Sequence, residues 1–258
     1  MVGVTMLKAL LTRFRQGHRT MAYPDAPQPL PARFRGLPVI EPARCGDGCR
    51  ACAAACPYGC ISASGSLTLD MGTCLFCADC VAACPHDAIS FSATDACLAS
   101  RTREGLTVTA GEEYHAAVAL EGELLRLFGR SLKLREVSAG GCNACEADTN
   151  VLSTIGWDLG RFGIQFVASP RHADGMFVTG PVSENMREAL LATYAAIPEP
   201  KLVIVAGACA INGGPFKDHA EVHNGADGFV PVDLYIPGCP PSPLTILDGL
   251  LRLVGRVK

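Results

Sequence analysis

The chain has 258 residues, of which 49% are hydrophobic and 18% are charged, and its net charge is −3. This composition can bury a sizeable core, which excludes a disordered protein, and the negative balance argues against general nucleic-acid binding. The length favours two compact units. No stretch predicts a membrane span, and the short N-terminal apolar patch, followed by Arg13, Arg15 and Arg19, is a poor secretory signal.

The first 35 residues predict a basic amphipathic arm. Six Lys and Arg residues face a single acid, Asp25, so this segment carries +5 and residues 36–258 carry −8. Apolar side chains recur at helical spacing between Met6 and Phe14. We expect a helix that lies on an anionic membrane surface or docks on a partner, with a frayed terminus as the alternative. The proline-rich residues 23–31 predict an extended strap.

Fourteen cysteines are distributed unevenly, with nine of them between Cys45 and Cys84. Disulfide bonds suit small secreted domains, whereas this chain lacks a convincing secretory signal and has a core large enough to fold without them. In a reducing compartment the same residues bind metal. We therefore expect metal ions or clusters.

Residues 45–91 contain an internal repeat with a period of 28 residues. The first copy has Cys49, Cys52, Cys56-Pro57 and Ile61-Ser62, and the second has Cys77, Cys80, Cys84-Pro85 and Ile89-Ser90. With Cys74 in front of it, the second copy matches the bacterial ferredoxin run for a [4Fe–4S] cluster, in which the fourth Cys ligates the other cluster. The repeat therefore predicts two clusters.

The repeat also predicts which thiols share a cluster. Cluster one is assigned to Cys45, Cys49, Cys52 and Cys84, and cluster two to Cys74, Cys77, Cys80 and Cys56. Structural zinc sites are the alternative, although zinc does not require this run twice over. Cys45 and Cys49 are separated by three residues instead of two, which Gly46 and Gly48 can absorb. Cys60 and Cys97 are interpreted as small buried residues.

Helical spacing predicts a bridging helix within residues 101–130. Beyond it, apolar segments at 133–137, 164–168, 175–179 and 202–206 predict strands, and residues 184–197 and 243–254 predict helices. This alternation is typical of a parallel α/β sheet, whose ligands lie at the carboxyl ends of the strands.

Four cysteines lie in Gly- or Pro-rich loops of this C-terminal half: Cys142, Cys145, Cys209 and Cys239. At least two of these loops follow a predicted strand, so a doubly wound sheet brings them to one edge. The pattern predicts a third cluster with these four ligands. Zinc remains the alternative here, because loop spacing alone does not exclude it.

Four segments of the C-terminal half resemble the small subunit of the [NiFe]-hydrogenase and respiratory complex I superfamily. They read GGCNACEAD, RFGIQFVASPRHADGMFVTGPV, VAGACAINGGPF and DLYIPGCPPSPLTILDGLL. They are most similar to membrane-bound group 4 hydrogenases of the formate hydrogenlyase type. The spacing of Cys142 and Cys145 is the hydrogenase-like form, whereas the complex I subunit has an adjacent Cys-Cys pair.

The N-terminal half resembles the two-cluster ferredoxin subunit of the same complexes, so the chain looks like a fusion of two neighbouring subunits. This resemblance implies an α+β bacterial-type 2[4Fe–4S] ferredoxin domain at 37–100 and a flavodoxin-like parallel sheet domain at 131–258. Residues 1–36 would be the basic arm and strap, and residues 101–130 a helical linker.

The resemblance implies an electron-transfer subunit with three [4Fe–4S] clusters and no catalytic residue of its own. It places a [NiFe] site on a partner large subunit and adds membrane subunits and a ferredoxin or formate dehydrogenase arm as partners, at the cytoplasmic face of the inner membrane. A nickel-free complex I-like quinone or ion-pumping oxidoreductase is the alternative. A zinc-stabilised scaffold or redox sensor is the third possibility.

Three further residues have weaker predictions. The resemblance suggests that Arg171 and His172 line the third cluster or the large-subunit interface, although a surface turn fits equally well. Glu146 is a candidate for a proton route, although a carboxylate at a helix start is also stabilised by the helix dipole alone.

Overall fold

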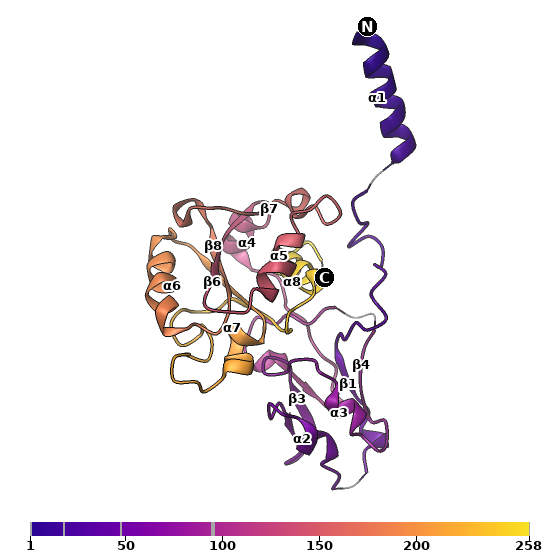
Figure 1. The fold of residues 1–258 in the computed structure, drawn as a ribbon, viewed down its shortest axis with the longest axis vertical. Helices are drawn as coiled ribbons and strands as arrows, with labels where there is room; N and C mark the ends of the chain where they lie inside the picture. The colour runs from indigo at the N-terminus through magenta and orange to yellow at the C-terminus, as the bar shows by residue number, and fades with distance from the viewer. Residues whose placement is uncertain (1, 18, 47, 94–95, 258) are drawn as a thin grey trace.

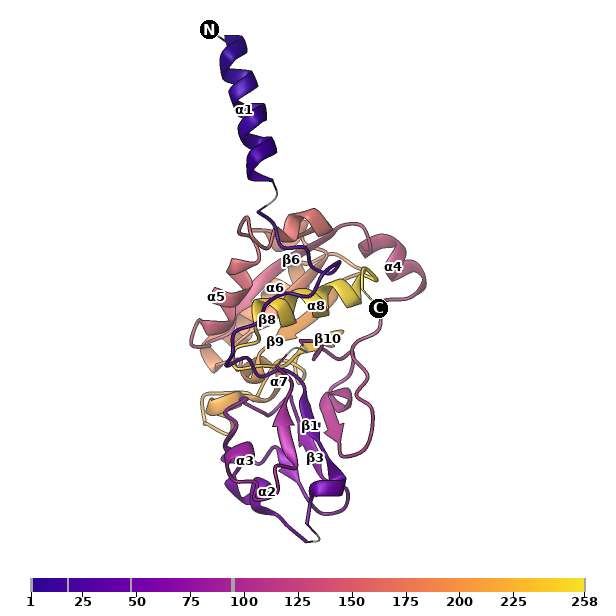
Figure 2. The same cartoon turned by 90° about the vertical axis from the view of Figure 1, so that its right-hand side faces the viewer.

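The N-terminal helix α1 (Val2–Gln16) stands apart from the rest of the chain in the computed structural model (Figure 1). The structure describes residues 2–17, 19–46, 48–93 and 96–257. An extended strap leads from α1 along a larger body, built on strands β6 to β10, to a smaller body built on strands β1 to β5 (Figures 1 and 2). Among the described residues, no helix has both the length and the apolar composition of a membrane span.

The smaller body consists of two short antiparallel sheets and two short helices. One sheet pairs β1 (Pro38–Ile40) with β4 (Ile89–Phe91), and the other has the order β2 (Ile61–Ser62), β3 (Thr68–Asp70), β5 (Thr107–Thr109). The helices are α2 (Ala51–Ala55) and α3 (Asp79–Ala82). Each copy of the sequence repeat supplies one helix and, through its Ile-Ser pair, one strand.

The predicted helix over residues 101–130 is wrong for most of its length. Residues 104–106 form a 3-10 turn, β5 pairs with β3, and only α4 (Gly122–Phe128) is helical. Alternation explains the strand, because Leu106 and Val108 are buried while Thr107 is exposed. The two glycines that flank this segment, Gly105 and Gly111, also weaken a helix.

The larger body is a five-stranded parallel sheet with helices on both faces. Its strands are β6 (Leu132–Ser138), β7 (Ile164–Phe166), β8 (Gly175–Thr179), β9 (Leu202–Ala206) and β10 (Leu234–Ile236). The sheet order is β10-β9-β8-β6-β7, and every neighbouring pair is parallel. This is the flavodoxin-like order, so the predicted fold class is confirmed.

The helices of the larger body are α5 (Ala144–Val151), α6 (Glu184–Ala196), α7 (Ala208–Asn212) and α8 (Pro243–Leu253). Strands β8 and β9 are buried along their whole length, as expected for a parallel sheet covered on both sides. Phe177 joins the core beneath α8, whereas its neighbours Met176 and Val178 join the core beneath α6 and α7. Helix α8 begins where Ser242 accepts a hydrogen bond from the Thr245 N–H.

A polar network joins the two bodies beside the thiol-bearing loops. Arg103 donates two hydrogen bonds to the Asp70 carboxylate, at 2.7 and 2.6 Å. Thr73, which also donates to Asp70, accepts a hydrogen bond from Asn212 of α7. An antiparallel bridge between Ser100 and Tyr235 adds a backbone connection. The loop that leads to Cys74 is therefore fixed to the helix that carries Cys209.

Candidate cluster-binding sites

The four C-terminal cysteines lie in loops that follow three strands of the parallel sheet. Cys142 and Cys145 come after β6, with Cys145 inside α5, while Cys209 lies in α7 after β9 and Cys239 follows β10. The order of the chain reverses between β6 and β8, which is where ligands of such sheets bind. The predicted gathering of these loops at one sheet edge therefore agrees with the topology.

The thiols of this C-terminal group interact electrostatically. Burial, followed by the negative charges of Cys209 and Glu146, raises the pKa of the Cys145 thiol. Burial, followed by Cys239 and Cys142, raises the pKa of Cys209 to about 12. Burial and then Cys142 raise the pKa of Cys239. The structure thus brings all four predicted ligands together in a place where their thiolate forms require a compensating positive charge.

Two glycines permit the close approach of backbone to these sulfurs. A Cβ atom on Gly207 would lie 2.6 Å from Cys145 Sγ, and a Cβ atom on Gly214 would lie 2.9 Å from Cys209 Sγ. Gly207 also has φ +91° and ψ 151°, a region that is almost restricted to glycine. The backbone can therefore lie this close to the sulfurs only because residues 207 and 214 have no side chain.

Glu146 is buried beside the C-terminal thiols, and its carboxylate is hydrogen-bonded. Its Oε1 atom accepts hydrogen bonds from Ser138 at 2.5 Å and from Thr179 at 2.7 Å. These bonds and its place in the first turn of α5 account for Glu146 structurally. Its role in proton transfer stays a prediction.

Glu136 is a residue that the sequence analysis missed. It lies on β6, and its buried Oε1 atom has no hydrogen-bond partner among the described residues. Burial, followed by the negative charge of Glu146, raises the pKa of the Glu136 carboxyl to about 7. The only sequence signal is alternation, because Glu136 stands where the spacing of Leu132 and Leu134 predicts an inward-facing residue.

The thiols assigned to cluster one come from both copies of the repeat. Burial raises the pKa of the Cys52 thiol, and the negative charges of Cys84 and Cys45 add to the rise. Cys49 and Cys45 line a cleft of about 380 Å³. Gly48 has φ +70°, so one of the two glycines expected to absorb the wider spacing adopts a left-handed conformation.

The thiols assigned to cluster two lie nearby. Burial, followed by the negative charges of Cys77, Cys60 and Cys56, raises the pKa of Cys80 to about 11. The Phe76 N–H donates a hydrogen bond to the sulfur of the remaining assigned ligand, Cys74, at 3.3 Å. Backbone donors to ligand sulfurs are a feature of iron–sulfur sites.

The two cysteines left outside the clusters differ from each other. Cys60 is buried, as expected, but its Sγ lies 3.1 Å from Cys56 Sγ. It is therefore a near neighbour of an assigned ligand, which the repeat alone does not predict. Cys97 is only partly buried, contrary to expectation, because it lines a cleft, and its sulfur accepts a hydrogen bond from the Arg252 side chain at 3.1 Å.

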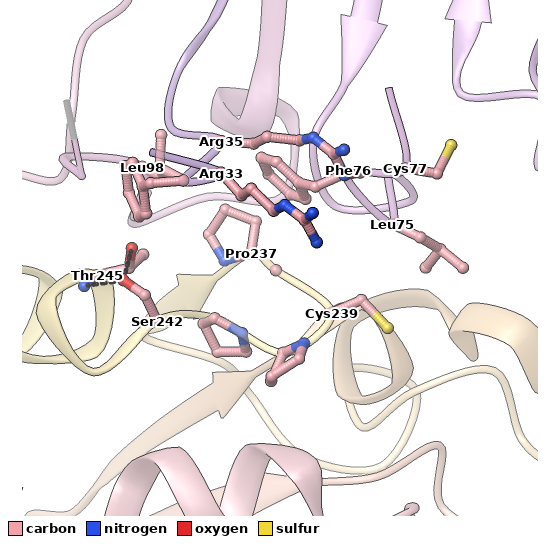
Figure 3. A pocket seen from close by; sticks show the side chains of 14 residues that line it. Arg33, Arg35, Leu75, Phe76, Cys77, Leu98, Pro237, Cys239, Ser242 and Thr245 are labelled. Atoms are coloured by element: carbon pink, nitrogen blue, oxygen red, sulfur yellow. Dashed lines mark hydrogen bonds between the residues drawn. The ribbon is translucent and has the colours of Figure 1, made fainter. Parts of the chain in front are cut away.

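A cleft of about 320 Å³ separates the thiols of the two bodies (Figure 3). Cys77 of the smaller body and Cys239 of the larger body both line this interbody cleft. Arg33 and Arg35 enter it from the strap, and Arg35 donates a hydrogen bond to the Phe76 carbonyl at 2.7 Å. The cluster-two ligands and the C-terminal ligands are thus neighbours across one cleft.

The donor chemistry of these sites fits iron–sulfur clusters. A bound metal lowers the pKa of coordinating thiols and keeps them deprotonated. Its positive charge is the one that the C-terminal thiolates require. The glycine approaches at Gly207 and Gly214 leave space at the sulfurs. In the described ranges, no three His, Cys, Asp or Glu side chains are placed to hold a single metal ion.

Arg171 and His172 are exposed on the 3-10 turn Pro170–His172, which follows β7. This position corresponds to the surface turn that the sequence left open. A role of these two side chains at the third cluster or at a partner interface stays a prediction.

Two family models match the chain. The family described as the 20 kDa subunit of NADH ubiquinone oxidoreductase matches residues 142–253, and a 4Fe-4S dicluster domain matches residues 44–88. Both matches cover the cysteine-bearing segments described above.

Three relatives represent the proteins to which the chain is similar. It is 41% identical to formate hydrogenlyase subunit 7 of Escherichia coli over 140 residues, which are 54% of this chain and 55% of that protein. It is 40% identical to the probable membrane-bound hydrogenase subunit mbhJ of Pyrococcus furiosus, over 52% of this chain and 81% of that protein. It is 45% identical to an NADH-quinone oxidoreductase subunit of Clostridium beijerinckii, over 45% of this chain and 70% of that protein.

Proposed function

The chain belongs to the family of the 20 kDa subunit of NADH ubiquinone oxidoreductase, and we propose that it is the iron–sulfur electron-transfer subunit of a membrane-associated oxidoreductase complex. The observation that carries this proposal is that thiols from distant parts of the chain interact, as Cys145 does with Cys209 and Cys239. The chemistry of the reaction itself would take place on a partner subunit.

The order of the three groups along the molecule supports a relay. Cys77 and Cys239 line the same interbody cleft, so the cluster-two ligands adjoin the C-terminal ligands. Cys45 and Cys49, which belong to cluster one, line a different cleft. We infer that cluster one is the outer station, cluster two the middle station and the C-terminal site the station nearest the partner.

A [4Fe–4S] cluster supplies one-electron storage and transfer when it is bound. The residues of this chain hold the ligands, exclude water and fix the spacing. Buried Cys52, Cys80 and Cys209 place sulfur in a poorly solvated environment. The network of Asp70, Arg103 and Asn212 keeps the two bodies in one arrangement.

The finer proposal is a group 4 [NiFe]-hydrogenase of the formate hydrogenlyase type. The spacing of Cys142 and Cys145 and the similarity to hydrogenase subunits support it. In this proposal the C-terminal site lies next to a [NiFe] centre on a large subunit, and a ferredoxin or formate dehydrogenase arm exchanges electrons with the smaller body. Membrane subunits would hold the assembly at the cytoplasmic face of the inner membrane.

A nickel-free complex I-like oxidoreductase is the second candidate. The similarity to the NADH-quinone oxidoreductase subunit of Clostridium beijerinckii favours it. The thiol groups would serve the same relay, and the electron acceptor would be a quinone. The large subunit distinguishes the two candidates, because only a hydrogenase requires paired CxxC motifs there to hold nickel.

Substitution of a C-terminal ligand tests the relay. In the complex purified with its native partners, Cys239→Ser should abolish turnover, while the electron paramagnetic resonance signals of the two ferredoxin-type clusters remain. Cys97→Ser is the matched control, because Cys97 is assigned to no cluster, and it should retain both turnover and all signals. Unchanged turnover in Cys239→Ser would contradict the relay.

A further inference from the structure

Helix α1 exposes an apolar face between Met6 and Phe14. Met6 and Leu10 are each 65% exposed, and Phe14 is 89% exposed. At 100° per residue these three side chains fall within about 80° of the helix circumference, and Leu7 and Leu11 widen this stripe to about 140°. Isolated helices of this length are marginal in water, so the exposed stripe requires a covering surface.

Positive side chains border this stripe on both sides. Lys8 and Arg15 lie beyond its Leu11 edge, and Arg13 lies beyond its Met6 edge. The first acidic residue of the chain is Asp25, so the helix carries only positive charge. Long basic side chains beside an apolar stripe can reach lipid phosphates while the stripe lies among acyl chains.

The strap fixes the place where α1 leaves the larger body. The Tyr23 hydroxyl donates to buried Asp248 at 2.6 Å, and Arg161 donates to the Tyr23 carbonyl at 2.8 Å. The Met21 N–H donates to the Gly156 carbonyl at 2.8 Å. The helix therefore projects from the end of the molecule that lies opposite the smaller body (Figures 1 and 2).

The larger body also exposes an apolar residue at this end of the molecule. Ile155, which precedes the Gly156 that the strap contacts, is 78% exposed. Ile155, the stripe of α1 and the positively charged Arg161 therefore lie at the same end of the molecule. An apolar stripe bordered by cations complements a negatively charged lipid surface better than it complements a neutral groove.

We propose that α1 lies in the plane of an anionic lipid surface and anchors this chain there directly. The stripe from Met6 to Phe14 enters the acyl boundary, and Lys8, Arg13 and Arg15 contact lipid phosphates. This inference goes beyond electron transfer and stands on α1 alone. It places the smaller body, with its ferredoxin-type thiols, on the side of the molecule away from the lipid.

Vesicle flotation of the full chain, with its clusters reconstituted, tests the anchor. We expect the chain to float with vesicles of phosphatidylcholine and phosphatidylglycerol, and to bind vesicles of phosphatidylcholine alone much more weakly. Removal of one cation, as in Arg15→Gln, should weaken partitioning about fivefold. Iron content is measured on the same samples, so a failure to bind lipid is separate from a failure to hold clusters.

A matched pair of substitutions separates the apolar stripe from net charge. Leu10→Glu and Thr12→Glu add the same charge two positions apart, but only Leu10 lies on the stripe. Leu10→Glu should weaken partitioning more than about tenfold, whereas Thr12→Glu should have the smaller effect of one added charge. Equal losses in the two variants would contradict insertion of the stripe.

A fluorescent reporter provides an independent readout. The chain has one tryptophan, so Phe14→Trp in a Trp157→Phe background places the only indole on the stripe. Its emission should shift to shorter wavelength with anionic vesicles. No binding to either vesicle overturns the proposal. If, in addition, Leu10→Glu releases the chain from its membrane subunits, the stripe docks on protein instead of lipid.

Discussion

The thiolate forms of the C-terminal cysteines are destabilised when no cation is bound. Burial is the first cause of the raised pKa of Cys145, Cys209 and Cys239, and repulsion among the thiolates is the next. A cationic iron–sulfur core removes both penalties, because it holds the thiolates as ligands. At the scale of single residues, these thiols therefore stay protonated unless a bound cation stabilises their thiolate forms.

Gly207 is not an assigned ligand, but its backbone lies against the sulfur of Cys145. In Gly207→Ala the new methyl group would meet Cys145 Sγ at 2.6 Å, and the backbone would be strained by about 1–3 kcal/mol. We expect loss of about four iron atoms per chain and retention of the ferredoxin-type signals. Gly228→Ala is the control, because a methyl group there meets nothing within 4 Å. Full iron content in Gly207→Ala would show that cluster binding does not require the close approach of the Gly207 backbone to Cys145 Sγ.

Glu136 predicts a dependence of stability on pH. Its folded pKa of about 7 lies above its ordinary value of 4.5, so the folded state binds the proton more tightly and loses stability as pH rises through this window. Glu136→Gln should therefore stabilise the chain by about 1–3 kcal/mol at about pH 8 and have little effect near pH 4.

Denaturant unfolding of the anaerobic chain at the two pH values measures this difference. The exposed Glu188 on α6 provides the control, and Glu188→Gln should change stability equally at both. A gain in Glu136→Gln that does not depend on pH would show that packing, and not ionisation, is responsible.

At the scale of elements, strands that are buried on both faces were the most predictable. The predicted ranges 175–179 and 202–206 coincide with β8 and β9, since continuous apolar runs leave little ambiguity. The three-residue strand β10 was missed, because Leu234–Ile236 is short and is flanked by Asp233 and Pro237. The helix predicted within 101–130 is wrong because the helical spacing of leucines holds only near the end of this range. The earlier residues include β5, which pairs with the distant strand β3.

The Asp70–Arg103 pair is a partly buried ion pair of the smaller body, and Asp70 also binds Thr73, which accepts a hydrogen bond from Asn212 of the larger body. Its members are only 27% and 25% exposed, so Arg103→Met should reduce the free energy of unfolding by about 2 kcal/mol. Arg126→Met is the control, because the Arg126–Glu123 pair is 72% and 75% exposed and should contribute less than about 0.5 kcal/mol.

The effect of Arg103→Met should also depend on pH. Burial alone would raise the pKa of Asp70, but hydrogen bonds from Arg103 and Thr73 outweigh it and hold this pKa below its ordinary value. The stabilisation is therefore complete above the unfolded pKa and is lost as pH falls through the folded one. Wild type and Arg103→Met should converge below about pH 3 in denaturant unfolding. A difference that persists in acid would contradict this origin.

At the scale of the whole molecule, cysteine spacing predicts three groups of ligands. The 28-residue repeat indicated the exchange of Cys56 and Cys84 between copies, and strand alternation indicated that three distant loops with four cysteines meet at one sheet edge. Spacing could not predict that Cys77 and Cys239 line one cleft, because this depends on how the two bodies pack. Nor could it predict the buried, unpartnered oxygen of Glu136 or the contact of Cys60 with Cys56.

In the proposed function, the whole molecule combines an electron relay with a projecting arm. The Thr73–Asn212 hydrogen bond and the Ser100–Tyr235 bridge connect the two thiol-bearing bodies, and both bodies line the interbody cleft. Helix α1 extends from the opposite end. This arrangement suits a subunit that conducts electrons along its length while one end faces a membrane complex.

Metal and acid-labile sulfide analysis of the anaerobically purified complex, with its native partners, tests the central claim most directly. Three [4Fe–4S] clusters predict about twelve iron atoms and about as many sulfide ions on this chain. Nickel near one atom per complex would support the hydrogenase candidate, and iron without nickel would support the complex I-like one. Zinc in place of iron, without labile sulfide, would contradict electron transfer and leave a zinc-stabilised scaffold or redox sensor.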